Sequence, residues 1–455
     1  MNLKEIRPYL KPLFVGFCFF VLLCGYQTTQ NFQSGINEEN GYISVALIYG
    51  CYGIGQFFTP AIVQFLTPKF SMVVAGLCYV FYIATNIKLI IPLYFVASSV
   101  CGFGASLLWS ASSTLLSGYE QHCKSPSFVY TLFYVPTYFN FIGNIIPMIF
   151  TPENPKWLFL ALTVIALVAV ILFCFSSNSP PTKIENVNDL MLSTCKYLVN
   201  WRLALFFPLA LLFGFSRSFY YTSMPVLAPI NMTPWIFISM GITMTISTFF
   251  WGWLNKLFSE KIVIVIPLIA EAIACLFGFI INEHFLNNTT VVPEDNVYLK
   301  IMVCLLGAVA GIGDSGFESI TVAMINRIWP KEVAPMCAWR IIYLSVMCIA
   351  LIYSAYVDCR IVLIIFGVAV VLATLFLFII VVSYKKVYLQ LEKDNNQRVK
   401  NEKLLEENDE EEKLVQNEDD VVPIEETSAV IAENPQSTTS SENDHIIRVD
   451  DDSEK

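Results

Sequence analysis

Histidine is scarce in this sequence, with His122, His284 and His445 as the only three among 455 residues. All three lie outside the long apolar stretches, so we expect no histidine-based metal site or proton relay within those stretches. The thirteen cysteines are scattered and form no CxxC pair, which argues against a disulfide framework or a zinc site. Charged residues make up only 14% of the chain, well below the share in typical soluble domains.

Motifs of enzymes are missing as well. The chain has no P-loop, no dinucleotide fingerprint and no nucleophile elbow, and no histidine lies near a serine in an apolar stretch. We therefore expect a protein that is not an enzyme and that has no cofactor and no metal. Nothing in the composition indicates a nucleic-acid partner.

Long apolar blocks dominate the sequence, because 56% of the residues are hydrophobic. Each block is long enough to cross a bilayer as a helix, and none shows the period-2 alternation of a membrane strand. This pattern predicts an all-α membrane protein with the lipid bilayer as its surroundings. The blocks, about twelve in number, lie near residues 12–30, 42–65, 71–87, 92–116, 128–150, 157–177, 203–222, 235–255, 262–281, 298–325, 333–357 and 361–384.

The net charge of −10 belongs to the C-terminal tail. From Lys385 onward the chain has 21 acidic and 9 basic residues, which leaves the preceding body slightly positive. A segment so polar and poor in aromatics cannot bury a core, so we expect it to be disordered. The predicted organisation is a six-helix bundle over 1–177, a cytoplasmic linker over 178–200, a second six-helix bundle over 201–384 and an acidic cytoplasmic tail over 385–455.

Orientation follows from the lysines and arginines of the short loops. They gather on the side of the N-terminus, so the positive-inside rule places both termini in the cytoplasm. The sequence leaves open whether the membrane is the plasma membrane or an endolysosomal one. The longest outer loop has two N-x-S/T sites, and Asn287 and Asn288 are therefore glycosylation candidates.

The two halves resemble each other in sequence. The segment 102–106 (GFGAS) aligns with 311–315 (GIGDS), and Gln56-Phe57-Phe58 aligns with Thr248-Phe249-Phe250. Extending the first match places Ala105 opposite Asp314 and Trp109 opposite Glu318. The common order of the matches predicts two repeats of six helices, as in the major facilitator architecture.

Ionisable side chains deep in the apolar blocks occur only in the second half. Asp314 and Glu318 are four residues apart and share one helix face, and Arg217 and Arg340 lie at similar depth in neighbouring blocks. A carboxylate in hydrocarbon costs about 2.5–3.5 kcal/mol on insertion scales, so partners are required. The four side chains form either a structural ion-pair cluster, which we favour, or a coupling or ligand site that exchanges protons.

The first half has polar but neutral side chains in its blocks. Candidates for the lining of a cavity are Tyr26, Gln27, Gln30, Asn31 and Trp109, although the amides could equally form hydrogen bonds between helices. Glu271 lies in a block that is peripheral in major facilitators. It could be protonated, turn toward a neighbouring helix, or face lipid as a site for a partner protein.

Several of these stretches together are similar to one family. They are Gln30-Asn31-Phe32-Gln33-Ser34, 41–50 (GYISVALIYG), Thr59-Pro60, 102–109 (GFGASLLW) and 311–315 (GIGDS). They resemble the uncoordinated-93 (unc-93) family, the ion channel regulatory protein branch of the major facilitator superfamily. The resemblance implies twelve spans and a role as an accessory partner of potassium channels or a trafficking chaperone of receptors. The family motif Asp-x-x-x-Asn-Thr-Gln is present only in its aspartate, Asp314.

Two hypotheses about function follow. The first is a non-enzymatic regulatory or trafficking partner of an ion channel or receptor, which the resemblance implies. The alternative is a secondary transporter of a small solute that works by alternating access, with Asp314 and Glu318 as its proton-coupling groups. A polar cavity reached from one side and lined by Arg217, Asp314 and Tyr26 favours transport, whereas a collapsed apolar centre favours the accessory role.

Overall fold

The computed structural model describes the chain except for its last segment and several connections. The described residues are 3–120, 126–150, 155–177, 187–258, 260–286, 297–329 and 334–383. The predicted tail and the glycosylation candidates Asn287 and Asn288 lie outside them. Within these ranges every regular element is helical, in agreement with the predicted all-α class.

The first half of the chain is built of long helices that are interrupted at proline residues. Its elements are α1 (Leu3–Gly55), α2 (Thr59–Leu66), α3 (Pro68–Thr85), α4 (Ile91–Glu120), α5 (Pro126–Tyr138), the 3-10 helix η1 (Phe139–Ile145), α6 (Ile146–Ile149) and α7 (Pro155–Cys174).

The second half follows after α8 (Val187–Leu198). Its elements are α9 (Trp201–Ala204), α10 (Phe207–Ser218), the π-helix η2 (Phe219–Ser223), η3 (Met224–Val226), α11 (Thr233–Leu257), α12 (Glu260–Val263), α13 (Val265–Ile281), η4 (Asn282–Leu286), α14 (Val297–Ile328), α15 (Ala334–Tyr356) and α16 (Cys359–Ser383).

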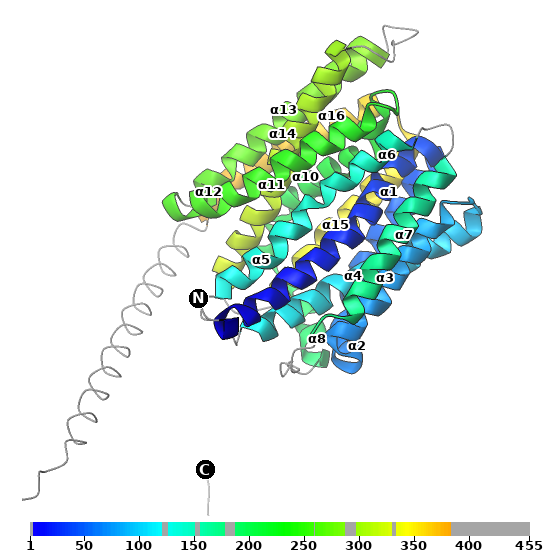
Figure 1. Ribbon diagram of the computed structural model, residues 1–455. Helices are drawn as coiled ribbons and strands as arrows, with labels where there is room; N and C mark the ends of the chain where they lie inside the picture. Colours follow the sequence, from blue (N-terminus) through cyan, green and yellow to red (C-terminus); the bar gives the residue numbers. More distant parts are fainter. Residues whose placement is uncertain are drawn as a thin grey trace, which may run out of the picture. The chain divides into compact units, whose positions relative to one another are not determined.

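Helix α1 folds back on itself and supplies two of the expected blocks. In a straight helix Gln30 and Tyr49 would lie roughly 28 Å apart, yet the Gln30 amide nitrogen lies 3.0 Å from the Tyr49 hydroxyl. The chain passes close to itself at Gly41, where a Cβ would lie 2.5 Å from the carbonyl oxygen of Gln33. Both arms pack inside the bundle, where α1 contacts α4, α5, α7 and α15 (Figure 1).

Among the described residues, ten helices are long and apolar enough to cross a membrane, from Tyr9–Asn37 to Cys359–Leu377. The remaining two of the expected blocks, 42–65 and 203–222, are interrupted. The first consists of the second arm of α1 followed by α2, and the second is divided among α9, α10 and η2. Proline in the first turn of α2 and of α10 marks the breaks.

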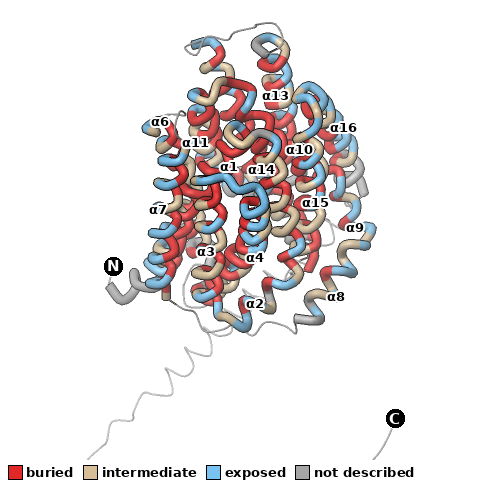
Figure 2. The backbone as a smooth tube through the Cα atoms, turned by 90° about the vertical axis from the view of Figure 1, so that its right-hand side faces the viewer, coloured by how far each residue is buried: buried red, intermediate tan, exposed pale blue. Residues whose placement is uncertain are grey.

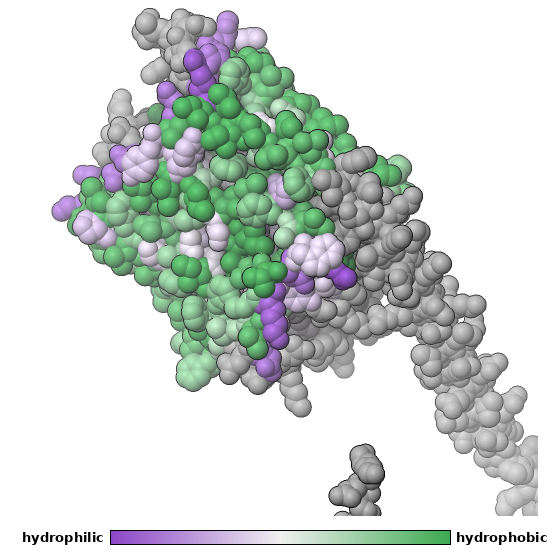
Figure 3. Space-filling view, turned by 180° about the vertical axis from the view of Figure 1, so that it is seen from behind, coloured by the Kyte–Doolittle hydropathy of each residue, from purple (hydrophilic) through white to green (hydrophobic). Residues whose placement is uncertain are grey.

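Apolar side chains form two cores and also cover the outer surface. One core contains buried residues from Val15 to Phe173, and the other contains residues from Leu203 to Leu377 together with Val45, Ala46 and Tyr49. Buried positions face the interior of the bundle in Figure 2, while the face shown in Figure 3 is mostly hydrophobic. A surface of this kind matches contact with lipid.

The two halves repeat the same packing between aligned residues. A Cβ at Gly102 would lie 2.3 Å from the carbonyl oxygen of Ile48, and a Cβ at Gly311 would lie 2.2 Å from that of Met240. Met240 is the counterpart of Ile48 in the aligned register of the two repeats. Glycine is therefore needed at both positions, because the helices approach to backbone contact there.

The serines that follow these glycines also repeat their contacts. Ser106 receives a hydrogen bond from the Gln56 amide nitrogen (2.8 Å) and lies 3.1 Å from the hydroxyl of Thr59. Its counterpart Ser315 receives one from the indole nitrogen of Trp251, at 3.0 Å. Trp251 is the counterpart of Thr59, so the internal duplication extends to individual side-chain contacts.

The close approach at Gly311 leads to a stability prediction. We expect Gly311→Ala to lower the free energy of unfolding by about 1–3 kcal/mol, because the added methyl group forces α11 and α14 apart. Gly367→Ala is the matched control, since a Cβ there would meet only the sulfur of Cys275 at 3.6 Å. Thermal unfolding in detergent measures both variants, and equal melting temperatures would contradict the prediction.

Candidate functional site

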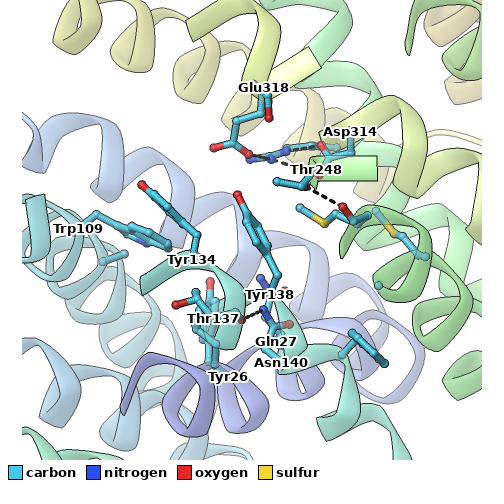
Figure 4. Close-up of a pocket in the computed structure, with 18 of the residues that line it drawn as sticks. Tyr26, Gln27, Trp109, Tyr134, Thr137, Tyr138, Asn140, Thr248, Asp314 and Glu318 are labelled. Atoms are coloured by element: carbon cyan, nitrogen blue, oxygen red, sulfur yellow. Dashed lines mark hydrogen bonds and ion pairs between the residues drawn. The ribbon is translucent and has the colours of Figure 1, made fainter. Parts of the chain in front are cut away.

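A cavity of about 590 Å³ lies among residues of both halves. The charged side chains of its wall all come from the second half, whereas the first half contributes aromatic and amide side chains (Figure 4). Residues of its wall include Tyr26, Gln27, Asn31, Trp109, Tyr134, Tyr138, Asn140, Arg217, Tyr221, Asp314, Glu318, Arg340 and Tyr343. The volume lies within the range of about 300–1,000 Å³ that is typical of small-molecule sites.

Arg217 is the centre of the charged wall. Its Nε donates a hydrogen bond to Asp314 Oδ1 at 2.7 Å, and one Nη donates to Asp314 Oδ2 at 3.2 Å and to Glu318 Oε2 at 2.6 Å. The two carboxylates lie one turn apart on α14, as their spacing predicts. The guanidinium also lies over the ring of Phe213, 4.2 Å from its centroid.

Burial differs between the two carboxylates. The Asp314 side chain is 2% exposed, whereas that of Glu318 is 45% exposed and faces the cavity. Arg217 is the penultimate residue of α10, and the π-helix η2 follows α10 directly. Such π segments occur frequently at functional sites, since the wider turn changes the direction in which side chains point.

Arg340 lies in the wall of the same cavity but not in this cluster. In the described part of the chain it makes no ion pair with Asp314 or Glu318, both of which bind Arg217 instead. The structure thus brings three of the four expected charges together. The sequence could not assign the pairing, because both arginines lie at similar depth.

Of the expected lining residues, Tyr26, Gln27, Asn31 and Trp109 border the cavity. Gln30 is buried beside it, where its amide nitrogen donates to the Tyr49 hydroxyl. Asn31 also donates to Asn144 Oδ1 at 3.1 Å, which links α1 to η1. Among these residues with amide side chains, some therefore line the cavity and others form hydrogen bonds between helices, and Asn31 does both.

Sequence reasoning missed most of the tyrosines that line the cavity. Tyr130, Tyr134 and Tyr138 follow one another at intervals of four residues, so they share one face of α5. This spacing was a signal for a polar aromatic wall. Tyr49, Tyr52 and Tyr343 have no comparable pattern and reach the cavity only through the packing of α1 against α15.

Glu271 is fully buried in α13, so the hypothesis that it faces lipid is wrong. The hydroxyl of Tyr220, from η2, donates a hydrogen bond to Glu271 Oε2, while Oε1 has no hydrogen-bond partner within the described ranges. A Cβ at Gly313 would lie 2.8 Å from Oε1, so glycine on α14 makes room for this carboxyl group. Glu271 thus links the π-helix next to Arg217 to the helix that bears Asp314.

The cavity is closed toward the tip of α1. The hydroxyl of Ser34 donates to the carbonyl oxygen of Tyr221 at 3.2 Å, and the rings of Tyr49 and Tyr221 are stacked with centroids 5.9 Å apart. On the same side a Cβ at Gly241 would lie 2.1 Å from that of Phe141. In the opposite direction the wall extends to residues near the beginnings of α5 and α15.

Metal binding has no support in the part of the chain that the structure describes, because no three His, Cys, Asp or Glu side chains gather there as potential ligands. Glu283 and Arg360 form a separate ion pair with a 2.6 Å N–O distance, on side chains that are 32% and 50% exposed. Neither residue lines the cavity.

Comparison with known proteins identifies similar sequences over most of the chain. Residues 32–378 match the family described as "Ion channel regulatory protein UNC-93". Protein unc-93 homolog A of Xenopus laevis is 22% identical over 72% of this chain and 83% of its own length. UNC93-like protein MFSD11 of Xenopus tropicalis is 25% identical over 41% of this chain, and the match spans less than half of that relative, 45%.

A third relative is the putative potassium channel regulatory protein unc-93 of Caenorhabditis elegans, 28% identical over 25% of this chain and 16% of that protein. Among solved structures, the nucleoside transporter NupG has a TM-score of 0.62 at 15% identity, covering 83% of this chain and 99% of that one. The peptide transporter POT, in complex with sulfate, has a TM-score of 0.65 at 11% identity, covering 85% and 95%. At these identities the structures show the major facilitator fold alone.

Removing the arginine of the cluster tests how much the cluster contributes to the stability of the protein. We expect Arg217→Gln to lower the free energy of unfolding by about 3–5 kcal/mol, because it leaves two carboxylates without their cation. Arg360→Gln is the matched control and should cost about 0–1 kcal/mol, as is usual for an exposed pair. Chemical unfolding of both variants in detergent micelles measures the difference, and a similar loss in both would refute the assignment.

The buried Glu271 leads to a second stability prediction. We expect Tyr220→Phe to cost about 1–3 kcal/mol, because the buried carboxyl group then loses the hydrogen bond that Tyr220 donates to it. Glu271→Gln keeps an acceptor for the Tyr220 hydroxyl at nearly the same volume, so it should cost less. Melting temperatures rank the two variants, and a more severe loss in Glu271→Gln would show that the charge itself matters.

Proposed function

Because the chain belongs to the UNC-93 family of ion channel regulatory proteins and has the major facilitator fold, we propose that it binds a small solute in its central cavity and transports it by alternating access. The observation that carries the proposal is the cavity itself, a space between the two halves that is lined by apolar and aromatic side chains and has Arg217, Asp314 and Glu318 in its wall. Major facilitators place their substrate site at this interface.

The contacts between the halves support a rocking motion. Ser34, Tyr49 and Phe141 contact the second half on the closed side of the cavity. To reach the state that opens on the other side of the membrane, the two halves would separate at these contacts and come together at the beginnings of α5 and α15. With the positive-inside orientation, the present state is open toward the cytoplasm and both termini are cytoplasmic.

Proton coupling through Asp314 and Glu318 belongs to this proposal. Both carboxylates bind one guanidinium, and one Nη of Arg217 donates to both of them, so protonation of Glu318 would release one N–H of that Nη while Asp314 keeps its two bonds. The partial exposure of Glu318 gives solvent access to that proton. The cluster then serves both as a structural ion pair and as the coupling group.

A second candidate function is regulation or trafficking of an ion channel or receptor. It is supported by the family description and by the relative that is titled a putative potassium channel regulatory protein. A lipid-facing apolar surface can bind either lipid or a membrane partner. Co-purification from native membranes decides between them, because a regulator retains a channel subunit in stoichiometric amount, whereas a transporter does not require one.

A reversible cross-link tests alternating access. A Cβ at Gly50, in the second arm of α1, would lie 3.8 Å from the Cβ of Cys348 in α15, which matches the spacing of a disulfide. We expect Gly50→Cys to form a disulfide with Cys348 under oxidation and to block solute uptake into proteoliposomes. Reductant should restore the uptake.

The control carries Gly50→Cys together with Cys348→Ser, and its uptake should not respond to oxidant. Undiminished uptake by a fully cross-linked protein would contradict a mechanism in which the two halves separate here. Absence of uptake for every solute, with a channel subunit bound, would leave the regulatory function as the better account.

A further inference from the structure

The charges around the cavity are not equally satisfied. Arg217 and Asp314 bond to each other twice, whereas Glu318 uses only Oε2 and shares the guanidinium of Arg217 with Asp314. Glu318 Oε1 makes no hydrogen bond within the described residues. One end of this wall therefore presents a surplus negative charge to the cavity, on a side chain that is 45% exposed.

Arg340 presents the opposite charge, and among the described residues it makes no ion pair. It lies in the cavity wall, which it shares with Tyr343 of α15 and with Tyr52 and Tyr134 of the first half. Tyrosine hydroxyls can accept hydrogen bonds from a guanidinium, but they do not neutralise its charge. A half-buried arginine that faces a cavity and pairs with no carboxylate in the described part of the chain is suited to bind an anionic group.

The two unsatisfied charges lie on the same part of the wall. Glu318 and Arg340 both border a small recess of about 20 Å³ next to the main cavity, together with Phe213 and Tyr343. A single small molecule can therefore reach both of them.

We propose that the solute is a small zwitterion whose carboxylate binds Arg340 and whose ammonium group binds Glu318. This inference rests on the proposed solute-binding function and specifies its substrate class. The charges of Arg217, Arg340, Asp314 and Glu318 sum to zero, so a dipolar ligand leaves the buried site neutral. An anion alone would face the surplus charge of Glu318, and a cation alone would leave Arg340 unpaired.

The rest of the wall indicates the body of the solute. Trp109, Tyr134, Tyr138 and Phe141 of the first half line the cavity, and the first three lie across from Asp314 and Glu318 in Figure 4. Aromatic faces of this kind bind planar or apolar groups. In an aromatic amino acid the ammonium and carboxylate groups are bonded to one carbon atom, which also carries the aromatic side chain. Such a molecule is small enough for this cavity.

The experiment uses four probes that share one side chain and differ in whether the amino end and the carboxyl end are charged. They are phenylalanine, N-acetylphenylalanine, phenylalanine amide and N-acetylphenylalanine amide, each added to the full-length protein in lipid nanodiscs. Binding is measured by quenching of tryptophan fluorescence, for which Trp109 in the cavity wall is a reporter, and by the shift in melting temperature. We expect phenylalanine to bind at least about tenfold more tightly than each of the other three, as is usual for hydrogen bonds between charged groups.

Two substitutions test which side chain binds which charged end of the solute. In Arg340→Gln the preference for phenylalanine over its amide should vanish, while Arg340→Lys should retain part of it. In Glu318→Gln the preference for phenylalanine over its N-acetyl derivative should vanish instead. Arg360→Gln removes an arginine that lies outside the cavity and should leave all four affinities unchanged.

The outcomes distinguish this inference from the proposed function. Equal binding of the four probes, or an equal loss of all of them in Arg340→Gln, overturns the zwitterion assignment. If none of the four probes binds while another solute is transported, the substrate class is wrong and solute transport stands. If no solute binds or is transported, both proposals fail.

Discussion

A single guanidinium in an apolar bundle constrains much of the second half of this protein. Arg217 has to lie where both Asp314 and Glu318 can accept its hydrogen bonds, since an unmatched charge at this depth costs several kcal/mol. That requirement ties α10 to α14. The π-helix η2 follows α10 directly, and its Tyr220 donates a hydrogen bond to Glu271 of α13, whose carboxyl group lies against Gly313 of α14.

The duplicated scaffold makes the difference between its halves informative. Ser106 and Ser315 make equivalent contacts, so the backbone packing of the two repeats is alike at this level. One turn away, however, Trp109 in the first half corresponds to Glu318 in the second. The same scaffold thus presents aromatic side chains from both halves to the cavity but charged side chains from the second half alone. A solute between them meets stacking surfaces and paired charges together, which is the basis of the proposed substrate class.

Much of the fold could be predicted from apolar length and spacing, because a bilayer leaves few alternatives to helices whose backbone bonds are internal. The predictions were less accurate where the chain breaks or bends. Two of the expected blocks, 42–65 and 203–222, are interrupted. Helix α1 is a single bent helix that contains block 12–30 and the first part of block 42–65. A hydropathy pattern records the length of an apolar stretch, but a proline in the first turn or a close contact at Gly41 depends on what packs beside it.

The sequence by itself determined the helical class, the internal duplication and the common face of Asp314 and Glu318, because each follows from periodicity along one segment. Only the tertiary structure decided that Arg217 rather than Arg340 binds both carboxylates, that Glu271 is buried, and that Tyr49 and Tyr343 reach the cavity. These facts depend on the rotation and depth of helices that are far apart in the chain. Side-chain packing between helices sets those quantities, and no local pattern records them.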